Sequence, residues 1–256
     1  MKIDDPDPYR DLRMSTESER FFRRSLEDYF ASSPGANVVK LQNFAKFVPR
    51  QSLTRFLSRY ELFKMVLRTQ GSIIECGVLQ GGGLMSFAQL SAIFEPVNWQ
   101  RQIIGFDTFD GFRDLSEKDR GESSSASLRE GGLAADSLGD LEACIRIFDA
   151  NRTLSHIPKC QLVKGDVRQT IPAFVERNPH TVVSLLYLDL DVYEPTKVAL
   201  EHFLPRMPKG AVLAFDELNA PNWPGETAAV IETIGLANLR IERFEFDSLL
   251  SYAVLP

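Results

Sequence analysis

The spacing of hydrophobic positions divides this chain near residue 70. Between Thr16 and Arg68, apolar residues recur every three or four positions, as they do on one face of a helix. Thr16 and Glu19 have the spacing of a capping box, so we predict that a helix begins there. Its stretch SERFFRRSLEDYFA should bury one apolar face. We interpret residues 1–70 as an N-terminal helical cap or lid, or as a surface for a homo-oligomer.

After residue 70, short apolar runs alternate with helical stretches. The runs that we predict to be strands are 72–78, 102–109, 160–167, 183–191 and 210–218. The helices that we predict between them are 84–94, 136–150, 169–177 and 194–204. Repeated strand–helix alternation is typical of an α/β fold with a parallel sheet and helices on both faces. Near the C-terminus, RIERFEF and SLLSYAVL are separated only by Asp247, which predicts an antiparallel hairpin.

Residues 110–135 interrupt this alternation and are polar, charged and rich in glycine and serine. A stretch of this length without apolar periodicity is usually a functional lid or a disordered segment. We predict a mobile lid loop there. The sequence has no repeat and no interdomain linker, so residues 1–256 are expected to form one domain whose α/β core is 71–256.

Composition narrows the classes of partner and compartment. A net charge of −6 gives no general attraction to nucleic acid or to an anionic membrane surface. The sequence has no apolar run of roughly 18 residues that would span a membrane. Cys76, Cys144 and Cys160 form no CxxC pair, which favours reduced thiols in a cytoplasmic protein. The opening MKIDDPDPYRD is polar and acidic, unlike a signal peptide.

Acidic residues follow two of the predicted strands. Asp189 and Asp191 end YLDLD, and Asp216 and Glu217 end VLAFDE. If these strands are neighbours in a parallel sheet, the four acids converge at the edge where open α/β sheets bind ligands. Carboxylates that close repel one another unless a cation is present, and Mg²⁺ prefers oxygen ligands. The cluster predicts a divalent metal and an active site, with simple capping of the elements as the alternative.

Three further positions suggest a small-molecule ligand. Glu75 opens the turn ECGVLQGGG, which lacks the dinucleotide pattern G-x-G-x-x-G and suits a cationic group such as an amine. Asp107 ends the second strand, where an acid can bind ribose hydroxyls, and Asp166 follows the third, where it could hold an adenine amino group. An ordinary strand–helix turn and ordinary turn aspartates remain alternatives.

Together, the segments IIECGVLQGGG, IIGFDTFDGF, LVKGDVRQTIP and LLYLDLDVYEPT resemble the macrocin O-methyltransferase family. The resemblance covers about residues 50–256. Members of that family are class I S-adenosylmethionine-dependent and metal-dependent enzymes that methylate sugar hydroxyls in natural-product biosynthesis. The resemblance implies a Rossmann-like, seven-stranded, mostly parallel sheet with a terminal antiparallel strand.

The resemblance also implies residue roles. The implied S-adenosylmethionine-binding residues are Glu75, Cys76, Gly77, Gly81, Ser86, Asp107, Thr108, Phe109, Asp166, Val167 and Asp189. The implied ligands of Mg²⁺ or another divalent cation are Asp189, Asp216 and Glu217. Asp191 matches the position of a general base, and we expect it to be catalytic together with Asp189. Glu217 stands where the family usually has a second aspartate.

Other functional classes share this sheet. A nicotinamide-dependent oxidoreductase or epimerase would need a dinucleotide glycine pattern and a Tyr/Lys pair, which the sequence does not show. A non-catalytic scaffold would not need the acid cluster. A methyltransferase of catechols or other small molecules remains an alternative, because a metal chelates vicinal oxygens of catechols and sugars alike. The expected partner is therefore a small sugar or glycosylated compound, with neither nucleic acid nor membrane.

Overall fold

In the computed structural model, which describes residues 7–9 and 15–256, the core is one seven-stranded sheet. Its strand order is β3-β2-β1-β4-β5-β7-β6. The strands are β1 (Ser72–Cys76), β2 (Ile103–Asp107), β3 (Cys160–Lys164), β4 (Val183–Leu188), β5 (Val212–Phe215), β6 (Glu242–Arg243) and β7 (Ser251–Val254). Strands β1 to β5 are parallel, and β7 runs antiparallel between β5 and β6. The predicted Rossmann-like sheet with a C-terminal antiparallel hairpin is confirmed, although the short β6, not β7, forms the edge.

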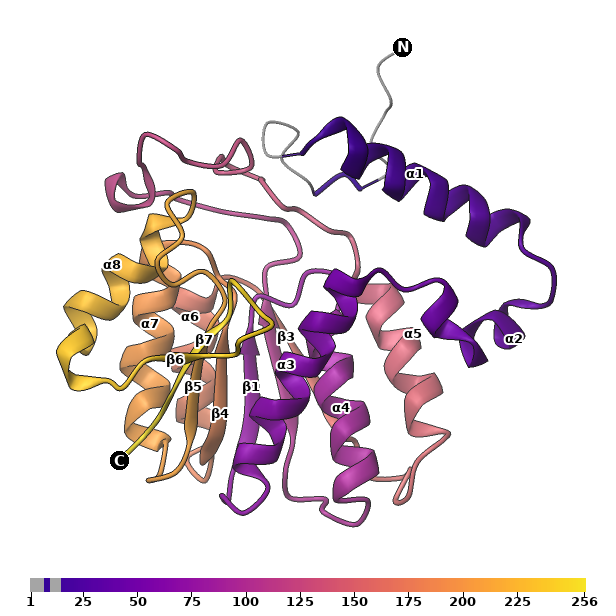
Figure 1. The fold of residues 1–256 in the computed structure, drawn as a ribbon. Coiled ribbons are helices and arrows are strands. Elements are labelled where there is room, and N and C mark those ends of the chain that lie inside the picture. The colour runs from indigo at the N-terminus through magenta and orange to yellow at the C-terminus, as the bar shows by residue number, and fades with distance from the viewer. Residues whose placement is uncertain (1–6, 10–14) are drawn as a thin grey trace.

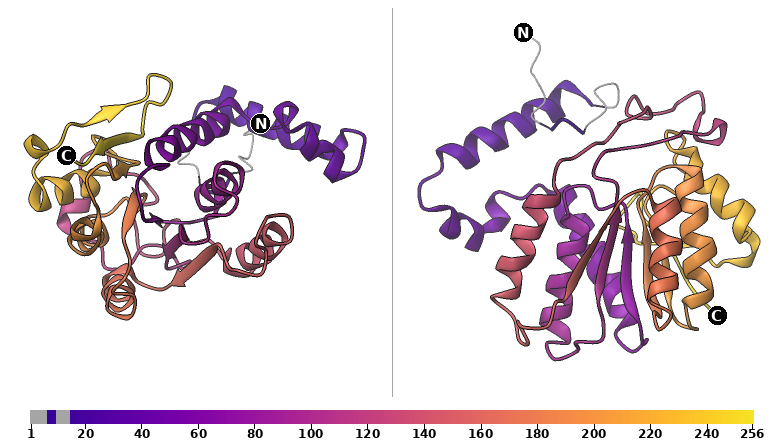
Figure 2. Two further views of the ribbon diagram at one scale, coloured as in Figure 1. Left: turned by 90° about the horizontal axis from the view of Figure 1, so that it is seen from below. Right: turned by 180° about the vertical axis from the view of Figure 1, so that it is seen from behind.

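Helices cover both faces of the sheet (Figures 1 and 2). One face packs against α3 (Arg50–Val66), α4 (Gly82–Phe94) and α5 (Leu138–Asp149). The other packs against α6 (Val167–Arg177), α7 (Tyr193–Phe203) and α8 (Pro224–Thr233). Alternate residues of a strand point to opposite faces, so Ile73 joins the first core cluster and Ile74 the second. Short 3₁₀ turns lie at η2 (Phe44–Lys46), η3 (Glu117–Asp119), η4 (Leu204–Arg206) and η5 (Leu236–Asn238).

Helix α8 was not expected from the sequence. It begins at Pro224, the favoured residue of a first helical turn, and Trp223 precedes it. Its buried positions include Gly225 and Glu226, so the usual apolar periodicity is weak. The helix packs on α7 and buries Ala229 and Val230 against it.

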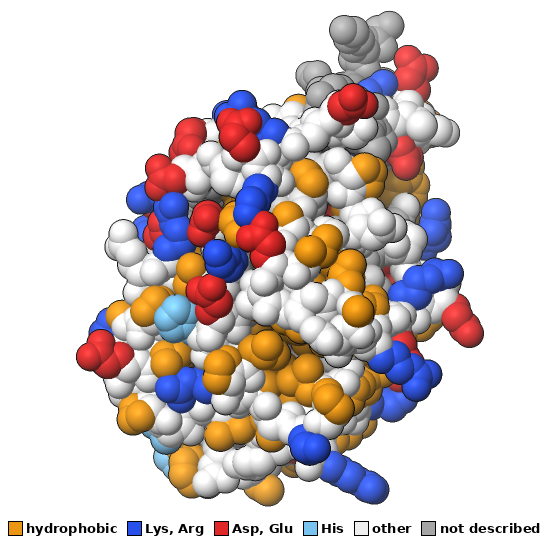
Figure 3. Space-filling model, turned by 90° about the vertical axis from the view of Figure 1, so that its left-hand side faces the viewer, with side chains coloured by type: hydrophobic (Ala, Val, Ile, Leu, Met, Phe, Trp, Pro, Cys, Tyr) orange, Lys and Arg blue, Asp and Glu red, His pale blue; other side chains and the backbone are white. Residues whose placement is uncertain are grey.

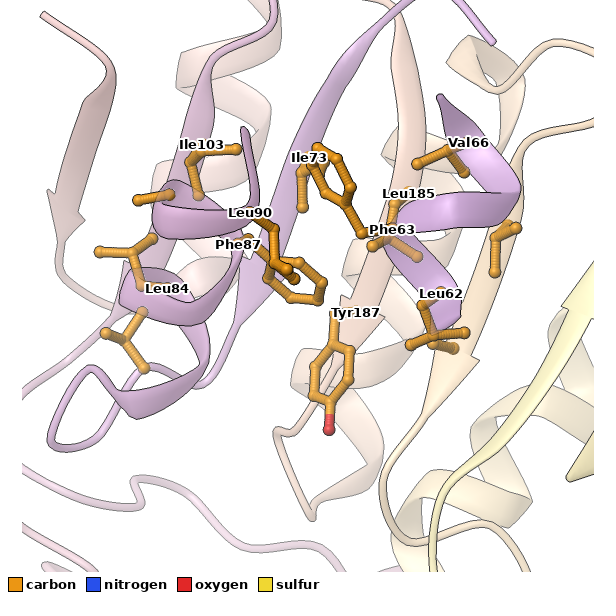
Figure 4. Close-up of a cluster of buried hydrophobic side chains, with 14 of the residues drawn as sticks. Leu62, Phe63, Val66, Ile73, Leu84, Phe87, Leu90, Ile103, Leu185 and Tyr187 are labelled. Atoms are coloured by element: carbon orange, nitrogen blue, oxygen red, sulfur yellow. The ribbon is translucent and has the colours of Figure 1, made fainter. Parts of the chain in front are cut away.

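Helix α3 is held against the sheet by a buried cluster (Figure 4). Its Leu62, Phe63 and Val66 are fully buried and lie beside Phe87 of α4 and Tyr187 of β4. The rings of Phe87 and Tyr187 meet edge to face with centroids 5.8 Å apart. This packing fixes the first half of α3 above the carboxyl edge of the sheet, where the predicted site lies.

Helices α1 (Glu17–Ser32) and α2 (Asn37–Gln42) instead project on the side of the molecule where α5 lies (Figures 1 and 2). The capping box at Thr16 is present as predicted. The buried apolar face expected for α1 is wrong: it has no buried residue, and Phe21 is 63% exposed. Among the described residues, the aromatic contacts of α1 lie at its C-terminal end, where Tyr29 and Phe30 meet Phe47.

The interpretation of residues 1–70 as a cap, lid or oligomer surface stays a prediction. Residues 1–6 and 10–14 lie outside the described part of the chain, and they include most of the opening segment that we compared with a signal peptide. None of the described helices is long and apolar enough to cross a membrane.

On the face of the molecule near α8, basic and acidic side chains are interspersed in the upper half and hydrophobic side chains gather below (Figure 3).

Candidate active site

A cavity of about 270 Å³ opens at the carboxyl edge of the sheet, between the turns that follow β1, β2, β3 and β4. Predicted site residues that line it are Glu75, Gly77, Asp107, Thr108, Asp166, Val167, Asp189 and Asp191. The loop predicted as a lid contributes Phe112 and Leu133 to the same wall. The structure therefore brings together most of the residues selected from separate motifs.

Four of the residues implied for the cofactor do not line this cavity. Cys76 is fully buried in the core, and Phe109 is 4% exposed. Gly81 is the N-cap of α4 with φ +80° and lies against Leu141, and the Ser86 hydroxyl donates to the Gly82 carbonyl at 2.6 Å. Contact of these four residues with the cofactor stays a prediction. Asp216 and Glu217 also lie beside the cavity and not in its lining.

Gly77 is required by a close backbone approach. It follows β1 with φ +91°, and a Cβ there would lie 1.8 Å from the carbonyl oxygen of Asp189. The Asp189 N–H donates to the Cys76 carbonyl at 2.8 Å, which continues the β1–β4 ladder by one residue. The turn after β1 and the segment after β4 are thus in direct contact, and Glu75 and Asp189 share one cavity.

The carboxylate of Asp107 holds the turn between β1 and α4. It accepts the N–H groups of Val78 and Leu79 at 2.7 and 2.8 Å, and that of Phe109 at 2.7 Å. Leu79 has φ +49°, a left-handed conformation that costs energy in a side-chain-bearing residue and needs such support. A carboxylate has about four acceptor positions, so one remains for a ligand hydroxyl.

Glu75 is a buried acid with an unpaired oxygen. It is 1% exposed, and its Oε2 has no hydrogen-bond partner among the described residues. Burial raises the pKa of Glu75 to about 8, against the opposing charge of Arg59. A Cβ on Gly83 would lie 1.7 Å from Glu75 Oε1, so this glycine makes room for the carboxylate. The orphaned acceptor suits a cationic donor bound in the cavity.

Asp189, Asp191 and Glu217 carry more negative charge than their surroundings compensate. Burial, followed by the charge of Asp216, raises the pKa of Asp189 to about 7 and that of Glu217 to about 8. Burial and the neighbouring Asp189 raise the pKa of Asp191 well above its usual range. No hydrogen bond between described residues ends on these three carboxylates. The expected convergence of acids is present, and such a group of carboxylates suits a bound cation.

Asp216 differs because it is already neutralised. It is 2% exposed and accepts hydrogen bonds from both terminal nitrogens of Arg55, at 2.6 Å from Nη1, and from the Tyr187 hydroxyl at 2.7 Å. Arg59, one turn later on α3, lies over the Tyr187 ring with its guanidinium carbon 5.2 Å from the centroid. Two arginines of the N-terminal region therefore reach the site.

Sequence reasoning missed Arg55, Arg59, Tyr187, Glu226 and Asp119 as parts of this region. The i, i+4 spacing of the two arginines puts them on one face of α3, and that signal was available. Glu226 gave none: it is fully buried, its Oε1 accepts the Glu217 N–H at 3.0 Å, and its Oε2 has no described partner. Burial raises the pKa of Glu226 well above its usual range.

Asp166 is the N-cap of α6. Its carboxylate accepts the Arg168 N–H at 2.9 Å and pairs with the Arg168 guanidinium, which lowers its pKa. It keeps its place in the cavity wall, so the predicted adenine contact stays a prediction. The metal site also stays a prediction, because the described residues form no group of three or more His, Cys, Asp or Glu side chains placed to hold an ion.

Comparison with known proteins agrees with this geometry. Residues 74–218, more than half of the chain, match the methyltransferase domain family. The chain is similar to the calicheamicin methyltransferase CalS11, with 34% identity over 98% of this chain and 99% of that one and a TM-score of 0.89. An apo structure described as CalS11, TDP-rhamnose 3'-O-methyltransferase, matches with 33% identity, 96% and 99% coverage and a TM-score of 0.82.

A third structure, the O-methyltransferase NovP, shares the fold with 20% identity, 79% coverage of each chain and a TM-score of 0.61. No curated protein matches the chain. The family match includes Glu75, Asp107 and Asp189 of the cavity lining, and the two CalS11 matches cover 98% and 96% of the chain. The resemblance that the motifs indicated is confirmed, and this chain belongs to the S-adenosylmethionine-dependent O-methyltransferases.

Proposed function

We propose that this enzyme methylates a hydroxyl group of a sugar during the biosynthesis of a natural product. The observation that carries the proposal is one cavity with an unpaired carboxylate, Glu75, at the end of β1 and an acid cluster, Asp189 and Asp191, after β4. The sugar is supported by the TDP-rhamnose 3'-O-methyltransferase to which the chain is similar over 96% of its length.

The chain's own residues would bind S-adenosylmethionine along the β1 side of the cavity. The Glu75 carboxylate would accept the ammonium group of the methionine part, and the free acceptor position of Asp107 would take a ribose hydroxyl. Asp166 and Val167 would border the adenine. When bound, the cofactor supplies an electrophilic methyl group on a sulfonium, so the protein contributes positioning and exclusion of water.

Asp191 would act as the general base. It lines the cavity next to Asp189 and makes no described side-chain hydrogen bond, so its oxygens are available to a substrate hydroxyl. Burial raises its pKa, which strengthens it as a proton acceptor once it is ionised. The proton of the sugar hydroxyl would pass to an Asp191 oxygen while Phe112 and Leu133 of the loop exclude water.

The residues fit a divalent cation in chemistry. Asp189 and Glu217 offer carboxylate oxygens with no described hydrogen bond, and the Arg55 guanidinium supplies positive charge at Asp216. Asp189, Asp216 and Glu217 would hold Mg²⁺ when Arg55 leaves Asp216. The cation would lower the pKa of a substrate hydroxyl.

The test is methyl transfer from labelled S-adenosylmethionine to TDP-rhamnose, to free rhamnose and to a catechol, each with Mg²⁺ and with excess EDTA. We expect label in a sugar hydroxyl, with Mg²⁺ required, and a loss on the order of 100-fold in Asp191→Asn. Label found only in the catechol would reject the sugar assignment. Full turnover in excess EDTA would reject the requirement for a divalent metal and would not contradict methyl transfer to the sugar.

A further inference from the structure

The segment between β4 and α7 carries the proposed base in an unusual conformation. Asp191 has φ +62°, and the Val192 N–H donates to the Leu190 carbonyl at 2.7 Å, which closes a three-residue turn around Asp191. A γ-turn with a positive central φ is rare and strained. The position of the Asp191 carboxylate therefore depends on how firmly both ends of this turn are held.

The strand side of the turn is held by the sheet. The Asp189 N–H donates to the Cys76 carbonyl at 2.8 Å, and the Gly77 backbone packs against the Asp189 carbonyl. The helix side begins at Tyr193, the first residue of α7, whose N–H has no partner within the helix. Val192 precedes it as the N-cap residue and its side chain makes no capping bond.

The missing cap comes from the loop 110–135. Asp119 Oδ1 accepts the Tyr193 N–H at 2.6 Å, although the two residues are 74 positions apart. Asp119 Oδ2 accepts the N–H and the hydroxyl of Ser116 at 2.7 and 2.8 Å, so both oxygens of this carboxylate are hydrogen-bonded, and Asp119 is 2% exposed. A buried carboxylate held by several donors fixes its partners strongly.

Helix α8 leaves space for this contact. A Cβ on Gly225 would lie 2.2 Å from Asp119 Oδ1 and 2.6 Å from the Tyr193 nitrogen. Two backbone hydrogen bonds also join the two ends of the loop. The Phe112 N–H donates to the Gly132 carbonyl at 3.1 Å, and the Gly131 N–H donates to the Phe112 carbonyl at 2.9 Å. The segment that walls the cavity and the carboxylate that caps α7 therefore belong to one seated loop.

We propose that Asp119 is a positioning residue for methyl transfer, which holds the Tyr193 end of the turn and thereby aligns Asp191 only when the loop 110–135 is seated. The inference rests on the proposed role of Asp191 as the base. The contact between Asp119 and Tyr193 would couple the exclusion of water by the loop to the alignment of Asp191. When the loop is displaced, Asp119 moves away from the Tyr193 N–H and the strained turn at Asp191 can relax. Asp119 itself does not line the cavity.

The test compares Asp119→Ala with Glu117→Ala, which removes an exposed acid of the same short turn. We expect Asp119→Ala to lower kcat for methyl transfer to TDP-rhamnose on the order of 10- to 100-fold, with the KM for S-adenosylmethionine and the Kd for S-adenosylhomocysteine changed by less than about threefold. Hydrogen exchange should quicken in peptides covering residues 189–196 and stay unchanged in residues 72–83. Glu117→Ala should behave as wild type.

Asp119→Asn keeps one oxygen that can accept the Tyr193 N–H, so it should recover part of the lost kcat. It also carries the test if Asp119→Ala does not fold. A wild-type kcat in Asp119→Ala, or a loss of S-adenosylhomocysteine affinity equal to the loss of kcat, would overturn the positioning role. A wild-type enzyme that transfers no methyl group would overturn the proposed function alone, because exchange at 189–196 still reports whether Asp119 holds the turn.

Discussion

Arg55 and Asp216 are 161 positions apart and form an ion pair with two hydrogen bonds beside the cavity. The arginine comes from the N-terminal region and the aspartate from the end of β5, so this pair ties α3 to the carboxyl edge of the sheet. Its guanidinium supplies positive charge where the sequence predicts a divalent cation. The pair therefore decides how the acid cluster is neutralised in the absence of metal.

Replacing Arg55 distinguishes its contribution to stability from its effect on metal binding. Arg55→Gln should lower the free energy of unfolding without metal by about 2 kcal/mol, because the buried Asp216 loses its guanidinium partner and keeps only the hydrogen bond from the Tyr187 hydroxyl. It should also tighten Mg²⁺ binding, since the ion no longer competes with a guanidinium. Chemical denaturation and calorimetric titration with Mg²⁺ measure the two changes.

The control is Arg24→Gln, which removes an arginine that pairs with Glu27 at 3.6 Å on the exposed surface of α1. Such pairs contribute about 0–1 kcal/mol, so neither quantity should change much. Weaker Mg²⁺ binding in Arg55→Gln would contradict the competition between arginine and ion.

Glu75→Gln tests the recognition of the cofactor. The amide keeps the shape of the side chain and removes the charge that the ammonium group would meet, so the affinity for S-adenosylhomocysteine should fall about 10- to 100-fold. Burial raises the pKa of Glu75 to about 8, so binding by the wild type should strengthen as the pH rises through that value. Isothermal titration across this range measures both effects, and a wild-type affinity in Glu75→Gln would remove Glu75 from the site.

The same acid makes the cofactor-free protein sensitive to pH. The pKa of Glu75 is about 8 in the folded protein and near its ordinary 4.5 in the unfolded chain, so the folded state binds more protons between these values. The free energy of unfolding should therefore fall as the pH rises from about 4.5 to about 8. Urea denaturation without ligand measures this slope, and Glu75→Gln should make it shallower. A slope that Glu75→Gln leaves unchanged would assign the effect to other groups.

The sequence predicted the sheet well because strands and helices leave local periodicities. Runs such as SIIEC and LLYL became β1 and part of β4, and Glu75 of the first and Asp189 after the second line one cavity. It predicted least where the structure depends on contacts between distant segments. The pairing of Arg55 with Asp216, and of Asp119 with Tyr193, has no local pattern, and α8 buries a glutamate where periodicity would call for an apolar residue.

The strand predicted over 183–191 ends earlier than expected. Strand β4 ends at Leu188, and Asp191 has left-handed backbone geometry beyond it. Both acids still line the cavity, because the chain turns around Asp191. The strained turn is held by contacts with Cys76 and Asp119, which are distant in the sequence, so no local pattern predicts it.

Gly77→Ala tests the closest backbone contact in the site. Alanine would need φ near +91°, and its Cβ would lie 1.8 Å from the Asp189 carbonyl oxygen, so either β1 or the turn after β4 must move. We expect a loss of about 3 kcal/mol or more in the free energy of unfolding, and loss of S-adenosylhomocysteine binding in any folded fraction.

The matched control is Gly139→Ala in α5, where a Cβ meets nothing within 4 Å. It should gain up to about 1 kcal/mol, because alanine is the better helix former. Equal stabilities of the two variants in urea would show that the chain after β4 can retreat from β1, and the shared placement of Glu75 and Asp189 would then lose its structural basis.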